Sequence, residues 1–488
     1  APYQFSTQYQ ADEDTGEYEL FLDNSVEFSQ IEDETTDWGF DGKLPFFVGE
    51  REFSFNIGYA YVEKDRESQG DFLIIPGFDR ECRDLRIDVA YGCEFSDNDA
   101  FQNVRSSQSP AFYVATQETD AGYALFDGQL TNFMRISVGG RYEDFIQVVE
   151  TRTARNTPGL ITPPLEESEF YPAGTLTWNF ADDLQLRVGY SESVTRPQFR
   201  EVGPSRFTNT ATNEQFIGNP FLQTTSITNY DARLEWYFGK DQFVTLGVFK
   251  KELENPIEAF NVGSGESRLV TFVNIDSAEV EGLEAEFQKA IPVSNWVDWS
   301  WFNSKDFQIT TNYTFTDSSI SATNPVRFLD QTAAARLSGI VSNLNETALI
   351  TAGTLIDLGA LTERSPDFDP SRQLQGQSEH MANFQIGYTD FEANSSLNLL
   401  LNYQSERIRS VESYTSDSPA IIEQPPMLLD LVYKRDFEFY GGNYKFGFKV
   451  KNILDESYEA FQESGGRRVD VDVYELGTSY SVSLSLEF

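Results

Sequence analysis

The residues that could carry chemistry are few in this chain of 488 residues. A Ser-His-Asp arrangement would have to use His380, the only histidine, which stands in Gln-Ser-Glu-His-Met just before a predicted strand. The sequence contains neither the Gly-x-Ser-x-Gly pattern of a nucleophile elbow nor a phosphate-binding P-loop. Acidic residues are so numerous that a pair of carboxylates indicates nothing without geometry. We therefore predict a protein that is not an enzyme, with no catalytic residues and no cofactor.

Cys82 and Cys93 are the only cysteines, and they lie in a polar stretch. Two cysteines and one histidine leave little scope for a His/Cys metal site, so we predict no bound metal. We predict instead that Cys82 and Cys93 form a disulfide that closes a local loop, which implies an oxidising compartment. The alternative is two free thiols.

The formal net charge of −42 argues strongly against a nucleic-acid partner, because such binding depends on Lys and Arg side chains that neutralise phosphates. A heavily solvated acidic surface accounts for this charge. A more specific interpretation of the negative charge is that extracellular loops attract cations, or bridge to lipopolysaccharide through divalent ions.

Alternation of apolar and polar side chains organises the chain, most clearly at its end. One face of a strand over 478–488 carries Tyr480, Val482, Leu484, Leu486 and Phe488. The other face carries serines and Glu487. The stretch has the length of a membrane-crossing strand, about 9–11 residues. On this segment alone, a half-buried strand of a soluble protein is the alternative.

The same alternation recurs along the whole chain, for example over 53–61, 184–190, 244–248 and 397–403. Short connections such as 181–183 and 239–242 take turns with long ones such as 195–228 and 454–476. This sorting is typical of a meander with short periplasmic turns and long outer loops, whereas Greek-key connections would not sort in this way. No apolar run is long enough for a transmembrane helix.

We therefore predict an all-β fold, a large antiparallel transmembrane β-barrel that occupies residues 1–488 with about 17 strands. Long extracellular loops are expected at 64–120 and 317–379, with a short helix over 331–343 packed on the barrel mouth. Counting back from Phe488 at the periplasmic end places the N-terminus outside, whereas such barrels begin and end in the periplasm. We therefore expect that N-terminal sequence is missing or that another chain supplies it.

Several motifs follow one another from residue 190 to the end of the chain. They are Tyr-Ser-Glu-Ser-Val-Thr-Arg-Pro at 190–197, Gly-Asn-Pro-Phe-Leu at 218–222, Leu-Glu-Trp-Tyr-Phe at 234–238, Glu-Val-Glu-Gly-Leu-Glu at 279–284, Val-Lys-Asn-Ile-Leu-Asp-Glu-Ser-Tyr at 450–458 and the terminal Phe488. In this order they resemble TonB-dependent outer-membrane receptors of the Caulobacter type, well over 190–488 and loosely before it. The resemblance implies a multi-pass barrel of about 22 strands in the outer membrane of a Gram-negative bacterium. The family's plug domain and TonB box are not recognisable, so the plug and the first strands are expected to be missing.

The motif residues have expected structural roles. Asn452 and Asp455 should cap the transition from strand to loop, since Asn and Asp bond to local backbone. Pro197 should end a strand, because proline cannot donate to the ladder. Gly282 either relieves crowding within the wall or marks a β-bulge.

The resemblance implies a receptor and transporter that takes up a scarce large solute, such as siderophore-iron, cobalamin or an oligosaccharide, by energy-coupled transport. Aromatic side chains of the outer loops would stack on the solute and arginines would bind its charged groups. The candidates are Tyr91, Arg206, Phe207, Phe216, Tyr414, Phe461 and Arg467. Local packing is the alternative role of each aromatic residue.

The expected partners are outer-membrane lipid, lipopolysaccharide, the TonB complex through a plug that is not present in this chain, and partner chains that complete the barrel. Two other functions stay open. A plugless barrel would act as a passive porin or as a scaffold with partner chains. A soluble acidic β-protein would be extracted without detergent, which a membrane barrel requires.

Overall fold

The computed structural model describes residues 3–6, 9–11, 18–20, 24–75, 113–152, 158–209, 214–262, 269–329, 348–349, 361–364, 372–411 and 419–487. Nearly all of these residues lie in β-strands. The helical segments among them are α3 (Phe199–Val202) and the 3-10 turns η1 (Val293–Asn295) and η2 (Ser300–Phe302). Within these ranges no helix has the length and apolar character needed to cross a bilayer. The predicted helix over 331–343 and the Cys82–Cys93 disulfide lie outside the described residues.

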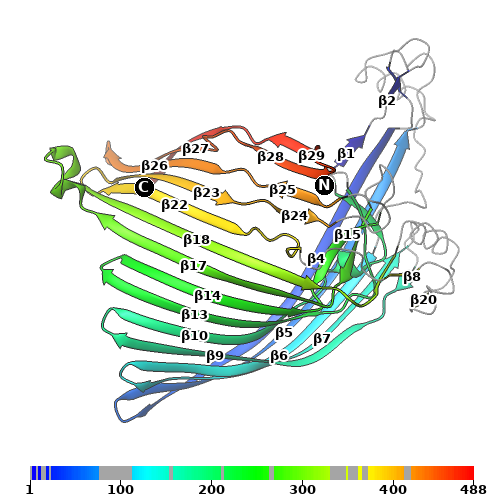
Figure 1. Cartoon of the computed structure of the whole chain (residues 1–488), viewed down its shortest axis with the longest axis horizontal. Coiled ribbons are helices and arrows are strands. Elements are labelled where there is room, and N and C mark those ends of the chain that lie inside the picture. The colour runs from blue at the N-terminus through cyan, green and yellow to red at the C-terminus, as the bar shows by residue number, and fades with distance from the viewer. Residues whose placement is uncertain are drawn as a thin grey trace.

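Fifteen long strands form one antiparallel meander in which each strand pairs with the next one along the chain (Figure 1). They are β4 (Asn24–Val48), β5 (Arg51–Ile75), β6 (Tyr113–Thr131), β7 (Met134–Arg152), β9 (Leu165–Ala181), β10 (Leu184–Thr195), β13 (Thr225–Gly239), β14 (Gln242–Glu254), β17 (Ser277–Ile291), β18 (Lys305–Ser321), β22 (His380–Asp390), β23 (Ser395–Gln404), β26 (Leu428–Phe439), β27 (Gly442–Lys451) and β30 (Ser479–Glu487).

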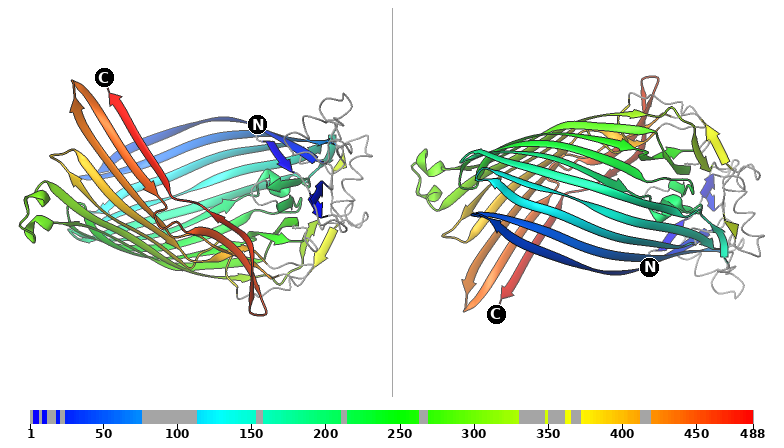
Figure 2. Two further views of the ribbon diagram at one scale, coloured as in Figure 1. Left: turned by 90° about the horizontal axis from the view of Figure 1, so that it is seen from above. Right: turned by 90° about the horizontal axis from the view of Figure 1, so that it is seen from below.

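Three short strands, β1 (Tyr3–Ser6), β8 (Pro158–Ile161) and β20 (Ala348–Leu349), join the meander, and the described residues form a sheet of 18 strands. The predicted all-β, antiparallel fold is therefore confirmed, with a strand number close to the predicted one. The sheet curls into the wall of a barrel (Figure 2).

Apart from the connection 292–304, short connections lie at one end of the wall and longer ones at the other, as the sequence predicts (Figure 1). At the short-turn end, two residues join β6 to β7 and two join β13 to β14. At the loop end the strands extend into ranges where connections were expected. The β5–β6 ladder continues to Ser68 opposite Tyr113, and β18 continues to Ser321. At this end of the wall the strands still pair through their backbones, although apolar and polar side chains no longer alternate. Alternation alone therefore predicts strands that are too short at this end.

The two faces of the wall differ in chemistry, because the register aligns alternate residues across the strands. One row of side chains on the same face comprises Leu186, Leu234, Leu246, Ala285, Tyr313, Ala382 and Tyr403. In this row Leu234 and Leu246 are 40% and 54% exposed. On the opposite face, their neighbours Glu235 and Thr245 are only 3% and 4% exposed. The convex face is therefore apolar and the concave face polar.

The wall has two edge strands. β30 pairs with β27, while β4 pairs with β5 and, at its beginning, with the short β1. Among the described registers none joins β30 to β4, and the two strands lie apart at the short-turn end (Figures 1 and 2). The hydrogen-bonding groups along these two edges are therefore available to further strands.

The motif residues behave as the sequence predicts. β10 ends at Thr195, two residues before Pro197. Asn452 and Asp455 both adopt a positive φ, of 53° and 54°, which these residue types tolerate. The side-chain amide of Asn452 donates to the Gly477 carbonyl at 3.3 Å, and the Asp455 amide donates to the Asn452 carbonyl at 3.1 Å. The predicted capping role is therefore confirmed for the Asn452 side chain, whereas Asp455 makes its contact through the backbone and its side-chain role stays a prediction.

Gly282 of β17 relieves crowding within the wall. Its registers with Phe249 of β14 and Thr316 of β18 run without a shift, so no bulge is present at this position. A Cβ atom on Gly282 would overlap the carbonyl oxygen of Phe315 and would lie 2.7 Å from the Phe249 ring. Only a residue without a side chain fits between these neighbours.

We expect Gly282→Ala to lower the free energy of unfolding by about 1–3 kcal/mol, because the added methyl group overpacks the wall. Urea unfolding of the folded chain in detergent, followed by tryptophan fluorescence, measures this change. Gly247→Ala on the neighbouring strand is the matched control, since its nearest heavy atom would lie 3.6 Å away. Equal stability of the two variants would contradict the crowding at Gly282.

Candidate functional site

The loop end of the barrel carries two further four-stranded sheets (Figure 1). The first has the order β11 (Arg206–Asn209), β12 (Glu214–Ile217), β16 (Leu269–Asn274) and β15 (Ile257–Asn261). The second has the order β24 (Arg407–Ser410), β25 (Ile421–Gln424), β28 (Ser457–Ser464) and β29 (Arg467–Glu475). A bridge between Phe260 and Val411 links the two sheets. We call these eight strands the cap.

Two predicted ligand residues meet in the first sheet of the cap. Phe207 lies opposite Phe216, and their rings stack with centroids 5.0 Å apart. Phe216 in turn stacks on Phe272 at 6.1 Å. Both predicted residues are partly buried against an apolar cluster that includes Val149 and Phe199. The structure therefore gives this aromatic pair a packing role, with part of each ring still exposed.

Arg206 lies on the same strand as Phe207 and pairs with Ile217 through the backbone. The other two described candidates lie in the second sheet. Phe461 of β28 is 5% exposed, and the guanidinium of Arg468 lies 3.9 Å from the centroid of its ring. The predicted Arg467 follows the turn before β29 and is exposed. Tyr91 and Tyr414 lie outside the described residues, so the seven candidates stay a prediction as a binding site.

A buried ion pair joins the first sheet to the segment before β22. Both guanidinium nitrogens Nη1 and Nη2 of Arg372 donate to the carboxylate of Glu258, at 3.0 and 2.5 Å. The Glu258 side chain is 1% exposed and that of Arg372 is 10% exposed. The backbone amide of Gln375 donates to the same carboxylate at 3.2 Å. The charge of Glu258 is thus compensated inside the cap.

Gln375 also connects the two sheets directly. Its side-chain oxygen accepts from the amide of Ala259 at 2.8 Å, and its side-chain nitrogen donates to the carbonyl of Arg409 at 2.6 Å. Arg409 in turn pairs with Asp472 on β29 at 2.5 Å. One network of polar contacts therefore holds the cap together from β15 to β29.

Asp276 fixes the connection that follows β18. Its carboxylate accepts the backbone amide and the hydroxyl of Thr323, both at 2.7 Å, and the side-chain amide of Asn324 at 2.9 Å. Partial burial raises the pKa of Asp276, but the hydrogen bonds from Thr323 and Asn324 outweigh it and lower the pKa below 3.8. Asp276 is therefore charged at neutral pH and keeps its four-point contact with 323–324.

The concave face of the wall carries ion pairs that cross several strands. Arg187 and Arg233 lie 3.6 and 3.4 Å from Glu235, and Arg233 lies 3.2 Å from Glu286. Nearer the loop end, Arg196 lies 2.8 Å from Glu143 and its guanidinium lies 4.2 Å from the Phe145 ring. Positive and negative groups compensate each other along this face.

Sequence reasoning missed all of these pairs. Most of their members are far apart in the chain, and the one close pair, Arg233 and Glu235 of β13, stands among many other charged residues. Two signals were available, since Arg196 stands within the motif that precedes Pro197 and Arg372 is a cation in an acidic chain. In the part of the chain that the structure describes, no group of three His, Cys, Asp or Glu residues could hold a metal ion.

A wall of long antiparallel strands, apolar outside and polar within, with a folded cap at one end, defines a large outer-membrane type of β-barrel. The family model described as "TonB dependent receptor-like, beta-barrel" matches residues 2–453. The chain therefore belongs to the TonB-dependent receptor β-barrel family. No curated relative matches the sequence.

Solved structures share the fold at low sequence identity. The unliganded ferric citrate transporter FecA aligns with a TM-score of 0.58 and 12% identity over 99% of this chain and 57% of FecA. The siderophore receptor PiuA of Acinetobacter baumannii aligns at 0.56 and 13% over 96% and 57%. The ferric preacinetobactin receptor BauA of Acinetobacter baumannii aligns at 0.52 and 14% over 100% and 59%. The chain thus spans less than two thirds of the length of these proteins.

We expect Arg372→Met to loosen the cap by about 3–5 kcal/mol, because the change leaves the Glu258 carboxylate buried without its cation. Limited proteolysis of the folded chain in detergent measures this as faster cleavage within the cap. The double variant Glu258→Leu/Arg372→Met removes both charges and should recover most of the resistance. Equally fast cleavage of the single and double variants would show that packing, not charge compensation, holds this junction.

Proposed function

We propose that this chain forms the wall and the mouth of a receptor in the outer membrane of a Gram-negative bacterium. The receptor takes up a scarce large solute, of the siderophore-iron, cobalamin or oligosaccharide class, by energy-coupled transport. The observation that carries the proposal is the difference in polarity between the two faces of the wall. An exposed apolar face that continues across the strands suits hydrocarbon, and a concave face with compensated charges suits a water-filled interior.

The presence of the cap favours a function as a receptor over a function as a simple pore. Its two sheets are joined by the Phe260–Val411 bridge and by the contacts of Gln375, so they form a defined surface at the loop end. Defined surfaces of this kind position side chains for recognition. In the proposal Arg206, Phe207, Phe216 and Arg467 contribute to solute binding from this surface, together with Tyr91 and Tyr414. Phe461, which is buried beneath Arg468, would support this surface from below.

Family membership and the names of similar structures support the coupling and the solute class. FecA is a ferric citrate transporter, and PiuA and BauA are siderophore receptors by name. In this chain, energy coupling would pass to the TonB complex through a plug domain outside residues 1–488. Lipid and lipopolysaccharide would surround the wall. The proposed protein is a transporter and not an enzyme.

The two edge strands favour a second candidate, a barrel that acts with partner strands. β30 is exposed along its whole length. One of its edges pairs with β27, and no described strand pairs with the other edge. Unpaired edges of this length recruit further strands, because each leaves a row of backbone donors and acceptors without partners. We propose that strands outside residues 1–488, from the same or another polypeptide, pair with β4 and β30.

We expect Arg467→Ala to weaken binding of the transported solute about tenfold, which corresponds to about 1.4 kcal/mol, because an exposed cation at the cap is lost. Binding and uptake of ferric siderophores, cobalamin and oligosaccharides are measured in a receptor-deletion strain that carries the intact gene. Lys240→Ala at the short-turn end is the charge-matched control and should bind normally. Uptake that persists without TonB would contradict energy-coupled transport and favour a passive pore.

We expect fast hydrogen exchange at about half of the amides of β30 and β4 in the chain purified alone, because alternate amides of an edge strand have no partner. The same amides should be protected in the native membrane. β14, which pairs on both sides, is the control and should be protected in both samples. Full protection of β30 in the isolated chain would show that it needs no partner strand.

A further inference from the structure

One connection at the short-turn end differs from its neighbours. The segment 292–304 joins β17 to β18 and contains η1 and η2, whereas two residues join β6 to β7. We call this segment the tryptophan turn. It holds Trp296, Trp299 and Trp301, which are three of the six tryptophans in the chain.

The aromatic rings of the tryptophan turn are exposed although they contact one another. Trp296, Trp299 and Trp301 are 72%, 58% and 42% exposed. The rings of Trp299 and Trp301 stack at 5.6 Å, and Trp301 meets Phe302 edge-on at 4.9 Å. Large apolar groups that stay exposed together mark an interaction surface.

The contacts of the turn show which side of the wall it occupies. Trp301 lies 6.4 Å from the Phe307 ring and 5.7 Å from the Tyr388 ring, between centroids. Phe307 and Tyr388 are direct partners, and Tyr388 is opposite Leu397, in the apolar rows of the convex face. The turn therefore packs on the convex face, away from the concave interior.

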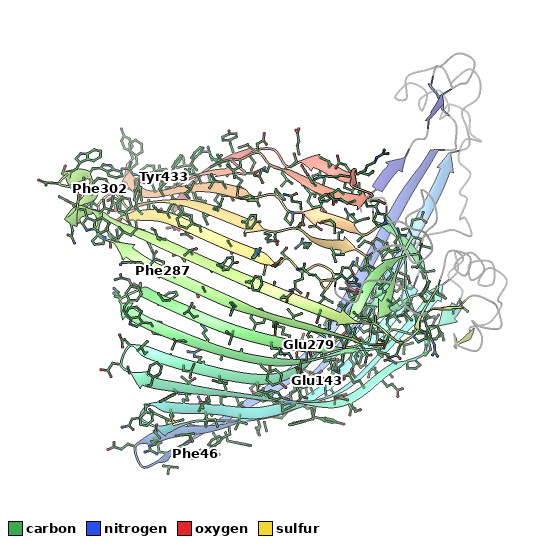
Figure 3. All side chains as sticks on the ribbon, viewed as in Figure 1. Phe46, Glu143, Glu279, Phe287, Phe302 and Tyr433 are labelled. Atoms are coloured by element: carbon green, nitrogen blue, oxygen red, sulfur yellow. The ribbon has the colours of Figure 1, made fainter. Side chains whose placement is uncertain are left out.

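Other exposed aromatic residues ring the same end of the barrel. Phe47, Phe133, Phe391 and Tyr440 stand in or beside the short turns and are 68%, 49%, 66% and 93% exposed. Figure 3 shows Phe302 of the tryptophan turn and Phe46 of the β4–β5 hairpin at this end. Such a ring is where a barrel meets the boundary between hydrocarbon and lipid headgroups.

The chemistry of the turn fits that boundary. Indole combines a large apolar ring with one N–H donor, so it prefers a layer that is apolar on one side and wet on the other. The cation of Lys305 lies 4.2 Å from the Trp301 ring and pairs with Asp390 at 2.7 Å. Both side chains of this pair are buried beneath the turn, so the pair fixes the position of the Trp301 ring at the root of the turn.

We propose that the tryptophan turn is an interfacial anchor that inserts Trp296, Trp299 and Trp301 among the phospholipid headgroups of the leaflet at the short-turn end. The turn lies on the convex face and continues the band of exposed aromatic residues at this end of the barrel. This position favours lipid as the partner of the turn, rather than a protein in the barrel interior or in the aqueous phase. The inference rests on the proposed position of the wall in the outer membrane, and it does not depend on which solute is transported.

The test uses a variant in which the turn holds the only tryptophans, Trp38→Phe/Trp178→Phe/Trp236→Phe. The chain is reconstituted in vesicles of phosphatidylethanolamine and phosphatidylglycerol. We expect lipids with a nitroxide near the headgroup to quench the fluorescence at least twofold more than lipids with a nitroxide deep in the acyl chain. We also expect weaker quenching by aqueous acrylamide than in the same variant unfolded in urea.

The converse variant, Trp296→Phe/Trp299→Phe/Trp301→Phe, keeps the tryptophans of the wall and reports whether the barrel itself is inserted. Lipid quenching of the wall tryptophans together with strong acrylamide quenching and no lipid quenching of the turn would overturn the anchor and leave the proposed function intact. Absence of lipid quenching in both variants would overturn the membrane placement, and the anchor with it.

Discussion

The register between neighbouring strands is the constraint on which the whole wall depends. Side chains alternate with a period of two, so a slip of one residue would turn every apolar side chain of a strand to the concave face. The ladder from β10 to β14 keeps Leu186, Leu234 and Leu246 in one row, and the polar neighbours of these residues stay inside. Close contacts such as that of Gly282 with the Phe249 ring fit only this register.

The cap depends on a different kind of contact. Its strands are short, and their alternation would not fix how the two sheets lie together. Buried polar groups do this instead, because Glu258 and Arg372 compensate each other and Gln375 bonds to both sheets. A buried charge without its partner is costly, so such a network permits few alternative arrangements. The surface that would meet a solute is thereby held to one shape.

The wall could be predicted from the sequence because hydrocarbon and water require opposite side chains at alternate positions, and this requirement is local. The positive φ angles of Asn452 and Asp455 and the strand end before Pro197 are local as well. The ends of β5 and β6 were not predictable from alternation, since their polar segments continue to pair.

The contacts of the cap were not predictable either. Glu258 and Arg372 are 114 residues apart in the chain, and no periodic pattern connects them. Phe207 and Phe216 were selected as loop aromatics, and the structure places them opposite each other in a packed sheet. Among the arginines of the β28–β29 hairpin, composition could not distinguish Arg467 from Arg468. Only the geometry places Arg468 over Phe461.

The length of the first hairpin has a consequence for the position of the cap. β4 and β5 have 25 residues each. At about 3.3 Å per residue and a tilt of about 45°, they rise about 58 Å along the bilayer normal, roughly twice the thickness of the hydrocarbon core. The segment that contains the Asp33–Arg66 pair lies at the loop end, and one face of it packs on the cap side, where the Arg66 guanidinium lies 5.5 Å from the Phe199 ring. In the proposed membrane placement, this charged segment would hold the cap at a distance from the lipid.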